Sequence, residues 1–257
     1  MTQRAPFWAV NERDVVSVHG PDALTYLHGQ ASQSLTDLAI GESRWTLMLE
    51  PTGKIVSLAR AWRTAEDTVV LDTDAGFGDA LAERLNRFRI RVKAEIDSLP
   101  WTSLVVRGAD AGDGRGHVVG WWGEGRDLLG AGPTPPDDIA EGAAEDVEWA
   151  RVHAGWPAMG AEIVPGATIP AETGLTAVAV DFRKGCYPGQ ELVERMASRG
   201  ADAPRRLRRL TVAPGSASGD PIVVDGVEVG TLTSVVGADA LGYVRRGVEI
   251  GEPVGPG

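Results

Sequence analysis

The first hundred residues alternate between short apolar runs and turn-forming residues, and the spacing of the apolar positions predicts a mixed α+β region. Val15 to Val18 form a short apolar run that is typical of a strand. Gly20-Pro21-Asp22 follow; Pro and Asp favour the start of a helix, and Gly29 favours its end. The pattern therefore predicts a strand over 15–18 and a helix over 23–29.

The next stretch predicts a β-hairpin and then a strand, a helix and another strand. Pro51-Thr52-Gly53 is a turn signal between two apolar runs, which is typical of a hairpin. Apolar residues spaced by four and three then predict a helix, and alternation after it predicts a strand with one apolar face. The expected strands cover 45–49, 55–62, 68–71 and 89–96; the helix carries Leu81, Leu85 and Phe88, and the face of the last strand carries Ile90, Val92, Ala94 and Ile96.

The segment 109–145 shows neither the apolar spacing of a helix nor the alternation of a strand. It is rich in Gly, Pro and Asp, and Gly132-Pro133-Thr134-Pro135-Pro136 cannot lie inside a helix or a central strand. We interpret this segment as a domain boundary or a long loop. After Pro204, evenly spaced β-rich runs separated by Gly or Asp predict a small barrel or barrel-like sheet. These runs cover 207–212, 221–224, 227–232 and 240–244.

Composition narrows the class of protein. With 257 residues, 43% of them hydrophobic, the chain can bury a sizeable core. No apolar run has the length of a signal peptide or the roughly 18 to 20 residues of a membrane span, so we expect a cytoplasmic protein without a membrane partner. Cys186 is the single cysteine and the four histidines form no close ligand pair, so no disulfide framework and no bound metal are expected. No coiled-coil seam is evident, which favours a monomer.

The charge is uneven along the chain. The net charge of −11 argues against a surface built for nucleic acid, so no stable nucleic-acid complex is expected. Locally the balance reverses, because six arginines fall within fifteen residues: Arg195, Arg199, Arg205, Arg206, Arg208 and Arg209. This cluster is either a solvated face or a dock for an anionic ligand, such as the phosphate of RNA or a polyglutamylated tail.

The single cysteine lies in the run Lys184-Gly185-Cys186-Tyr187-Pro188-Gly189-Gln190-Glu191. Pro188 and Gly189 precede an amphipathic stretch that extends to Met196, so the thiol is expected just before a helix N-terminus. The helix dipole and the ammonium of Lys184 would both favour a thiolate there. The alternative is a buried, inert cysteine.

This run resembles the defining motif of the YgfZ-type folate-binding proteins, relatives of the glycine-cleavage T-protein (aminomethyltransferase), whose mitochondrial members assist iron-sulfur protein maturation. The resemblance extends over nearly the whole chain and is weakest across 105–145. It rests also on Val18 to Gln30, on Arg199-Gly200, and on Arg151-Val152-x-x-Gly155-x-Pro157-x-x-Gly160-x-Glu162 with Ile169-Pro170-x-Glu172, which is similar to the segment that lines the folate cavity of the superfamily.

The resemblance implies an α+β fold arranged as a three-part ring around a folate channel. Its expected parts are a folate-channel domain (1–45 with 146–203), a second α+β domain (46–145) and a C-terminal β-barrel (204–257). It implies tetrahydrofolate, or a derivative, as cofactor. The expected catalytic residues are Lys184 and Cys186, and the expected folate contacts are Gln30, Arg151, His153, Glu162, Tyr187 and Gln190.

The chain departs from the aminomethyltransferases at two places. Residues 54–59 read Lys-Ile-Val-Ser-Leu-Ala, without the catalytic carboxylate that those enzymes carry after the position of Gly53. A positioned acid or base supplies about 100- to 10,000-fold in rate, so its loss argues against aminomethyl transfer. His153 stands where the superfamily often has a glutamate facing the pterin. Glu162 or Glu172 could replace that glutamate, although for each taken alone an ordinary surface residue is the favoured interpretation.

Three functions remain open. The favoured one is a folate-dependent accessory protein for iron-sulfur cluster assembly or repair, with iron-sulfur client or assembly proteins as partners and indirect effects on tRNA-modifying iron-sulfur enzymes. The second is an enzyme, a folate-dependent aminomethyl or other one-carbon transferase. The third is an interaction scaffold in which the motif is structural.

Overall fold

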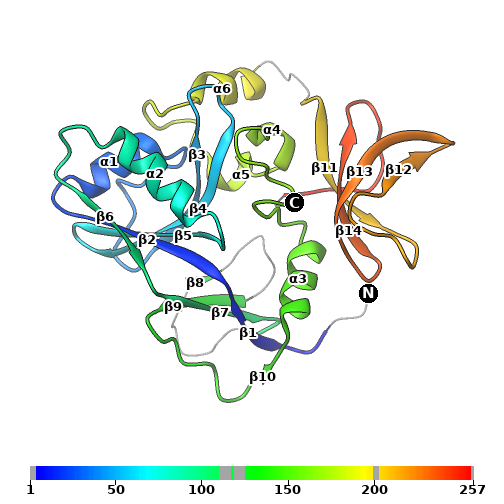
Figure 1. Cartoon of the computed structure of the whole chain (residues 1–257), viewed down its shortest axis with the longest axis horizontal. Coiled ribbons are helices and arrows are strands. Elements are labelled where there is room, and N and C mark those ends of the chain that lie inside the picture. Colours follow the sequence, from blue (N-terminus) through cyan, green and yellow to red (C-terminus); the bar gives the residue numbers. More distant parts are fainter. Residues whose placement is uncertain (1–3, 110–116, 119–124, 199–202, 256–257) are drawn as a thin grey trace. The chain divides into compact units, whose positions relative to one another are not determined.

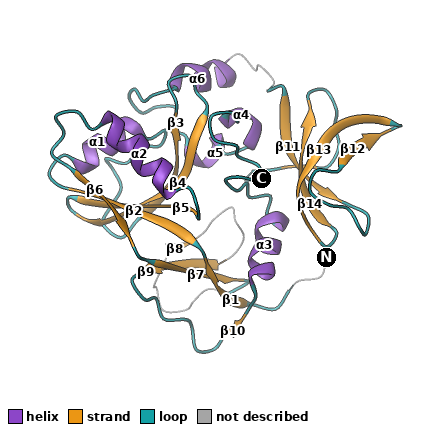
Figure 2. Cartoon of the chain, viewed as in Figure 1, coloured by secondary structure: helices purple, strands orange, loops and turns teal. Residues whose placement is uncertain are grey.

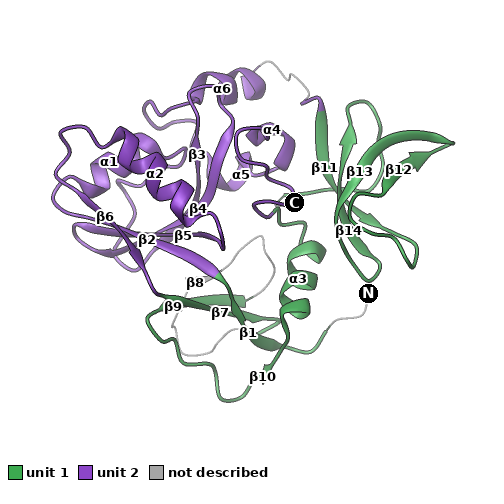
Figure 3. Ribbon diagram, viewed as in Figure 1, with its two compact units in different colours: residues 1–12, 101–157, 205–257 green, residues 13–100, 158–204 purple. Residues whose placement is uncertain are grey.

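The computed structural model describes residues 4–109, 117–118, 125–198 and 203–255. It is a mixed α+β structure with three five-stranded sheets (Figures 1 and 2). The chain divides into two compact units, each assembled from separate segments (Figure 3). Unit 1 comprises Met1–Glu12, Trp101–Pro157 and Arg205–Gly257, and unit 2 comprises Arg13–Pro100 and Ala158–Pro204. Within the described part of the chain, no helix has the length and apolar character needed to span a membrane.

Unit 2 is built on an antiparallel sheet with the strand order β3-β4-β5-β2-β6. The strands predicted near residues 15, 45, 55 and 68 are confirmed, and the first hairpin is the β3–β4 pair. The strands are β2 (Arg13–His19), β3 (Ser43–Leu49), β4 (Ile55–Ala65), β5 (Thr68–Asp74) and β6 (Glu95–Leu99).

Two helices provide the other half of the unit 2 core, and both follow the predicted pattern. In α1 (Ala23–Gln30), Ala23 and Leu27 are fully buried, and in α2 (Gly78–Phe88), Leu81 and Leu85 are fully buried. They pack with apolar residues of the sheet such as Val16, Val18, Met48, Val69 and Leu71. The remaining helices of unit 2 are α4 (Pro170–Thr173), α5 (Thr176–Ala179) and α6 (Gln190–Ser198).

The strand predicted over 89–96 is wrong for its first six residues, because β6 begins at Glu95. Arg91 has a φ of 60°, which breaks an extended chain, and the side chain of Ile90 is 76% exposed. Lys93 is bonded to the start of α1 instead: its N–H donates to the Asp22 carboxylate, and its carbonyl accepts from the Asp22 N–H. The alternation of apolar residues therefore marks a partly buried loop.

Unit 1 contains two sheets, and the first was not foreseen in the sequence. Its order is β10-β1-β7-β9-β8, from β1 (Phe7–Asn11), β7 (Thr102–Arg107), β8 (His117–Val118), β9 (Gly125–Gly130) and β10 (Ala140–Glu141). The interpretation of 109–145 as boundary or loop is therefore wrong for three short strands. Pairing across the sheet holds them: β9 is antiparallel to β7 along its whole length, although its own sequence carries little alternation.

The second sheet of unit 1 has the order β12-β13-β14-β11-β15. Its four longer strands confirm the predicted C-terminal runs: β11 (Arg205–Thr211), β12 (Pro221–Val224), β13 (Val227–Val236) and β14 (Asp239–Arg245), joined by β15 (Glu252–Pro253). Helix α3 (Ala144–His153) packs on this sheet, and Val152 lies in one core with Leu207, Val236, Leu241 and Tyr243. Closure of the sheet into a barrel stays a prediction, as do the three expected domain ranges; the expected boundary after residue 45 falls inside β3.

A buried charge cluster fixes the centre of the unit 2 sheet. Asp72 is fully buried and accepts hydrogen bonds from Arg13 Nε (2.9 Å), Arg60 Nε (3.1 Å) and Trp62 Nε1. The Arg60 guanidinium lies 4.4 Å from the Trp62 ring centroid and 4.9 Å from that of Trp45. Burial alone would raise the pKa of Asp72, but the charges of Arg60 and Arg13 hold it below its usual value.

We expect Asp72→Asn to lower the free energy of unfolding by about 3–5 kcal/mol, because it removes the buried negative charge that the Arg13 and Arg60 guanidinium groups share. Urea denaturation followed by circular dichroism measures the change. Asp97→Asn is the matched control, since Asp97 is exposed and, among the described residues, pairs with the partly exposed His19. Its effect should stay within about 0.5 kcal/mol. Equal losses in the two variants would contradict the role given to the cluster.

The segment that precedes α6 packs closely on the turn between β3 and β4. A Cβ atom on Gly189 would lie 2.5 Å from the Glu50 carbonyl oxygen and 2.9 Å from the Gly53 Cα, and the φ of Gly189 is +83°. In return, a Cβ on Gly53 would lie 2.5 Å from the Cβ of Leu192 in α6. Two glycines therefore let the backbone before α6 touch the hairpin turn directly.

Gly189→Ala should cost about 1–3 kcal/mol of folding stability, because the new methyl group meets backbone atoms and the backbone is left-handed. Gly185→Ala, in the same motif, is the control: a Cβ there meets no atom within 4 Å. Thermal unfolding of both variants decides the matter, and a Gly189→Ala protein as stable as Gly185→Ala would rule out the close packing.

Candidate functional site

The cysteine motif lies in unit 2, in the loop between α5 and α6, which we call the motif loop (residues 181–189). Lys184 Nζ donates hydrogen bonds to the backbone carbonyls of His28 and Ala31, the second at 2.5 Å. These carbonyls lie at the C-terminal end of α1, where helix carbonyls lack intrahelical partners and attract cations. Burial lowers the pKa of Lys184 to about 8, against the opposing effect of the Asp181 charge.

Tyr187 and Gln190 connect the motif loop to α6. Tyr187 is buried, and its ring centroid lies 5.2 Å from Lys184 Nζ. Burial, together with the Glu194 charge, raises the pKa of Tyr187 to about 12. Gln190 Oε1 accepts from the Tyr187 N–H at 3.4 Å, and Gln190 Nε2 donates to Glu194 at 2.5 Å. Both side chains are therefore used within the fold of the loop.

Cys186 carries a free thiol and is exposed. The alternative of a buried cysteine is therefore wrong. The residue lies four positions before the start of α6, in a loop held at Lys184 on one side and at Gly189 on the other. The fold thus presents Cys186 to solvent between two fixed points.

Two other expected folate contacts of unit 2 are bonded to other groups of the fold. Gln30 Oε1 accepts a hydrogen bond from Arg84 Nη1 at 3.0 Å, and Arg84 also donates to the Leu49 carbonyl. Glu162 is fully buried and accepts from the Ala158 N–H at 2.9 Å, and Glu172 is buried as well. The idea that either glutamate is an ordinary surface residue is therefore wrong.

Arg151 and His153 belong to unit 1, on α3. Arg151 is buried and bonds to both carboxylate oxygens of Glu148, to the Trp156 carbonyl and to Ser234 Oγ, the last two at 2.7 Å. The guanidinium therefore ties α3 to β13.

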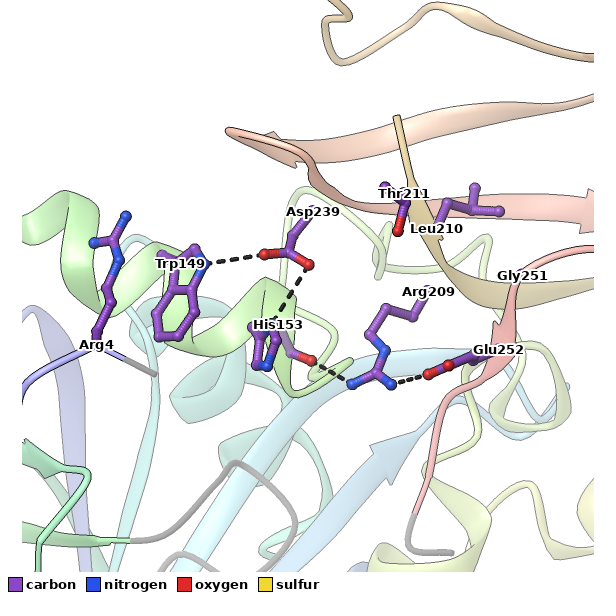
Figure 4. A pocket seen from close by; sticks show the side chains of 9 residues that line it. All are labelled: Arg4, Trp149, His153, Arg209, Leu210, Thr211, Asp239, Gly251 and Glu252. Carbon is purple, nitrogen blue, oxygen red and sulfur yellow. Dashed lines mark hydrogen bonds and ion pairs between the residues drawn. The ribbon is translucent and has the colours of Figure 1, made fainter. Parts of the chain in front are cut away.

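His153 lines a pocket of about 570 Å³ (Figure 4). Its ring stacks on Trp149 with centroids 4.7 Å apart. Its Nδ1 is buried and lies 3.4 Å from an oxygen of Asp239, in an ion-pair contact that does not meet hydrogen-bond geometry. The other Asp239 oxygen accepts from Trp149 Nε1 at 3.0 Å. The lining residues are Arg4, Trp149, His153, Arg209, Leu210, Thr211, Asp239, Gly251 and Glu252.

The pocket combines flat rings with charges of both signs. The Arg4 guanidinium lies 4.6 Å from the Trp149 ring, and Arg209 donates to the His153 carbonyl at 2.7 Å and pairs with Glu252. Its volume falls within the range of small-molecule sites. Sequence reasoning found His153 but missed Arg4, Asp239 and Glu252, since no motif links positions so far apart.

The arginine cluster is partly neutralised. Arg208 pairs with Glu249 at 2.8 Å, Arg209 pairs with Glu252, and the Arg205 guanidinium lies 4.0 Å from the Tyr243 ring. Arg199 and Gly200, which the resemblance used, lie outside the described residues. The pairing with carboxylates weakens the interpretation of this segment as a dock for an anion. Across the described residues, no three His, Cys, Asp or Glu side chains gather as a metal site would require.

Comparison with known proteins places the chain among distant relatives. No family model matches it. The chain is 27% identical to a protein of Chaetomium globosum described as "Iron-sulfur cluster assembly factor IBA57 homolog, mitochondrial", over 90% of this chain and 62% of that protein. It is 26% identical to a putative chloroplastic transferase of Arabidopsis thaliana, over 90% of this chain and 63% of that protein. The chain thus spans less than two thirds of the length of these two relatives.

A solved structure is similar over most of the chain. The glycine cleavage system aminomethyltransferase T from Bartonella henselae matches with a TM-score of 0.78 and 20% identity, covering 94% of this chain and 79% of that protein. The chain therefore has the fold of the glycine-cleavage aminomethyltransferases.

Proposed function

We propose that this chain is an accessory factor for iron-sulfur cluster assembly or repair that works with a bound tetrahydrofolate. The observation that carries the proposal is the similarity to an iron-sulfur cluster assembly factor over 90% of the chain. The proposal includes action in the cytoplasm as a monomer, the three-part ring with a folate channel and closed C-terminal barrel, and an indirect effect on tRNA-modifying iron-sulfur enzymes.

The exposed thiol of Cys186 supports a transient contact with a cluster or a client protein. Thiolates are the usual ligands of iron-sulfur clusters, and clusters need about four of them. The chain has a single cysteine, so it cannot hold such a cluster by its own thiols. Cys186 would therefore act together with ligands from an assembly or client protein.

The pocket around His153 suits a folate. A pterin presents amino and ring N–H donors, which the Asp239 carboxylate can accept. The glutamate tail presents carboxylates, which Arg4 and Arg209 would bind in exchange for their carboxylate partners in the fold, Asp146 and Glu252. The His153 ring, stacked on Trp149, adds a flat surface beside these polar groups. When bound, tetrahydrofolate carries one-carbon units on its nitrogens.

A one-carbon transferase is the second candidate, and the T-protein fold favours it. Strand β4 argues against it. Ser57 lies inside the stretch that lacks the carboxylate, and its hydroxyl is bonded to that of Thr73 at 3.1 Å. Asp72 lies opposite Arg60 on the neighbouring strand, and its carboxylate oxygens accept hydrogen bonds from two guanidinium groups and an indole. Neither group is free to act as a base. An interaction scaffold remains the third candidate.

We expect the purified chain to bind tetrahydrofolate in anaerobic calorimetry, and Asp239→Asn to weaken binding about 10- to 100-fold, the equivalent of one charge-assisted hydrogen bond. Asp225→Asn is the control, because Asp225 is an exposed hairpin residue outside the pocket. Absence of any binding would refute both folate-dependent functions. Equal affinities of the two variants would refute this pocket as the folate site.

In a strain that lacks this protein, we expect the wild-type chain but not Cys186→Ala to restore the activity of iron-sulfur enzymes, because the alanine variant has no thiol to offer a cluster. Enzyme activities in extracts are measured at matched protein abundance. Gly185→Ala is the control, since it changes the adjacent exposed residue without removing the thiol. Full restoration by Cys186→Ala would show that the thiol is dispensable.

A further inference from the structure

The motif loop is fastened to the end of α1 by a continuous seam of hydrogen bonds within unit 2. Lys184 provides two of them. Three others join the segment before it to the residues after α1: Ser32 Oγ to the Ala179 carbonyl (2.6 Å), the Asp181 N–H to the Ser32 carbonyl (3.0 Å), and Gln33 Nε2 to the Val178 carbonyl (3.1 Å). Lys184 is the last point of this seam before the exposed Cys186.

The lysine at this position stands out in an arginine-rich chain. Of the 25 basic residues only three are lysines: Lys54, Lys93 and Lys184. Lys54 and Lys93 are exposed, whereas Lys184 is half-buried with its Nζ between two carbonyl oxygens. A compact ammonium on a flexible stem can donate in two diverging directions in a small space, whereas a guanidinium is a planar fork.

The far side of Cys186 is held by a different contact. Gly189 touches the β3–β4 turn through its backbone, since a Cβ placed on Gly189 would come within 2.5 Å of the Glu50 carbonyl oxygen. Between the two attachments stand only residues 185–188, of which Gly185 and Cys186 are exposed. Loss of the attachment at Lys184 would let residues 185–188 move relative to the remaining attachment at Gly189.

We infer that Lys184 is a positioning residue: its N–H groups fasten the motif loop to the C-terminal end of α1 and so fix where the Cys186 thiol is presented. The inference rests on the proposed role of Cys186 for its biological meaning. It differs from a direct catalytic or thiol-activating role for Lys184, because its N–H donors are directed to backbone carbonyls.

Three other titratable groups face Lys184. Asp181 favours its charge, and the buried Tyr187 lies beneath it. His28 lies at the end of α1; its Nδ1 accepts from the Leu35 N–H at 3.2 Å, and burial and the Lys184 charge lower its pKa. A neutral Lys184 amine keeps two N–H donors, so the attachment persists when Lys184 loses its proton. Replacement by methionine removes every donor.

The test compares Lys184→Met with Lys54→Met, the matched control at an exposed lysine. Hydrogen exchange by mass spectrometry should show about 100-fold or more faster exchange in peptides covering 178–187 for Lys184→Met alone, since two charge-assisted bonds are lost. Alkylation of Cys186 by a maleimide, the one thiol of the chain, should change rate severalfold in the same variant. Lys184→Gln, which keeps an amide donor, serves if the methionine variant does not fold.

Two results would overturn the inference. One is exchange and alkylation rates in Lys184→Met equal to those in Lys54→Met. The other is a uniform rise in exchange across unit 2, which would mean a general stability role. Neither readout depends on folate or on iron-sulfur enzymes, so failure here is distinguishable from failure of the proposed function: Cys186→Ala could lose complementation while Lys184→Met leaves the loop unchanged, or the reverse.

The burial of Lys184 has a pH signature of defined sign. Because its pKa falls from 10.5 to about 8 on folding, the unfolded chain binds more protons between these values. The free energy of unfolding should therefore rise with pH from about 8 to 10.5 relative to Lys184→Met. Urea denaturation across this range measures it, with Lys54→Met expected to retain the rise. A flat difference between wild type and Lys184→Met would show that folding does not lower the pKa of Lys184.

Discussion

Unit 2 depends on one constraint: the backbone around the motif must approach two other pieces of chain closely enough to touch them. At Gly189 the contact is backbone against backbone, and a single methyl group would close the space. At Lys184 the contact is an ammonium against carbonyls that a helix leaves unpaired at its end. Glycine and lysine thus have separate physical reasons to stand in the same eight-residue run.

These two contacts change the meaning of the motif. Taken as a string, Lys184 beside Cys186 suggests a cation that stabilises a thiolate. In the folded chain the ammonium is directed to α1, Gln190 bonds within the start of α6, and Tyr187 is buried. Most residues of the motif therefore hold the loop in place, and the exposed thiol of Cys186 is the group that can react.

The sequence was sufficient for elements whose apolar pattern and turns agree. The β3–β4 hairpin, α2 and the four longer C-terminal strands are of this kind, and so was the helix after Gly189. It failed where pairing across a sheet decides the structure, as in β9, which is held by its pairing with β7 and carries little apolar alternation of its own. It failed also at 89–94, where an alternation typical of a strand is overridden by the bonds between Lys93 and Asp22.

The candidate site shows the same division. The motif identified Cys186, and the resemblance drew attention to His153, but the pocket beside His153 is completed by Arg4, Asp239 and Glu252, which only tertiary packing brings together. Arg151 and Gln30 have the polar character expected of ligand contacts, yet their hydrogen bonds go to Glu148, Trp156, Ser234 and Arg84. A polar residue in a segment that resembles a ligand site can therefore serve either in hydrogen bonds within the fold or in contacts with a ligand.

The fold of an aminomethyltransferase does not bring that chemistry with it, because reactions depend on groups that are free at the site. A general base needs an open lone pair and a pKa near the working pH. Asp72 has neither, since Arg13, Arg60 and Trp62 occupy its oxygens and its pKa is held low. A carboxylate bound in this way stabilises a sheet. The shared fold therefore does not make Asp72 a base: its two oxygens are bonded to Arg13, Arg60 and Trp62, and its charge serves to hold β4 and β5 together.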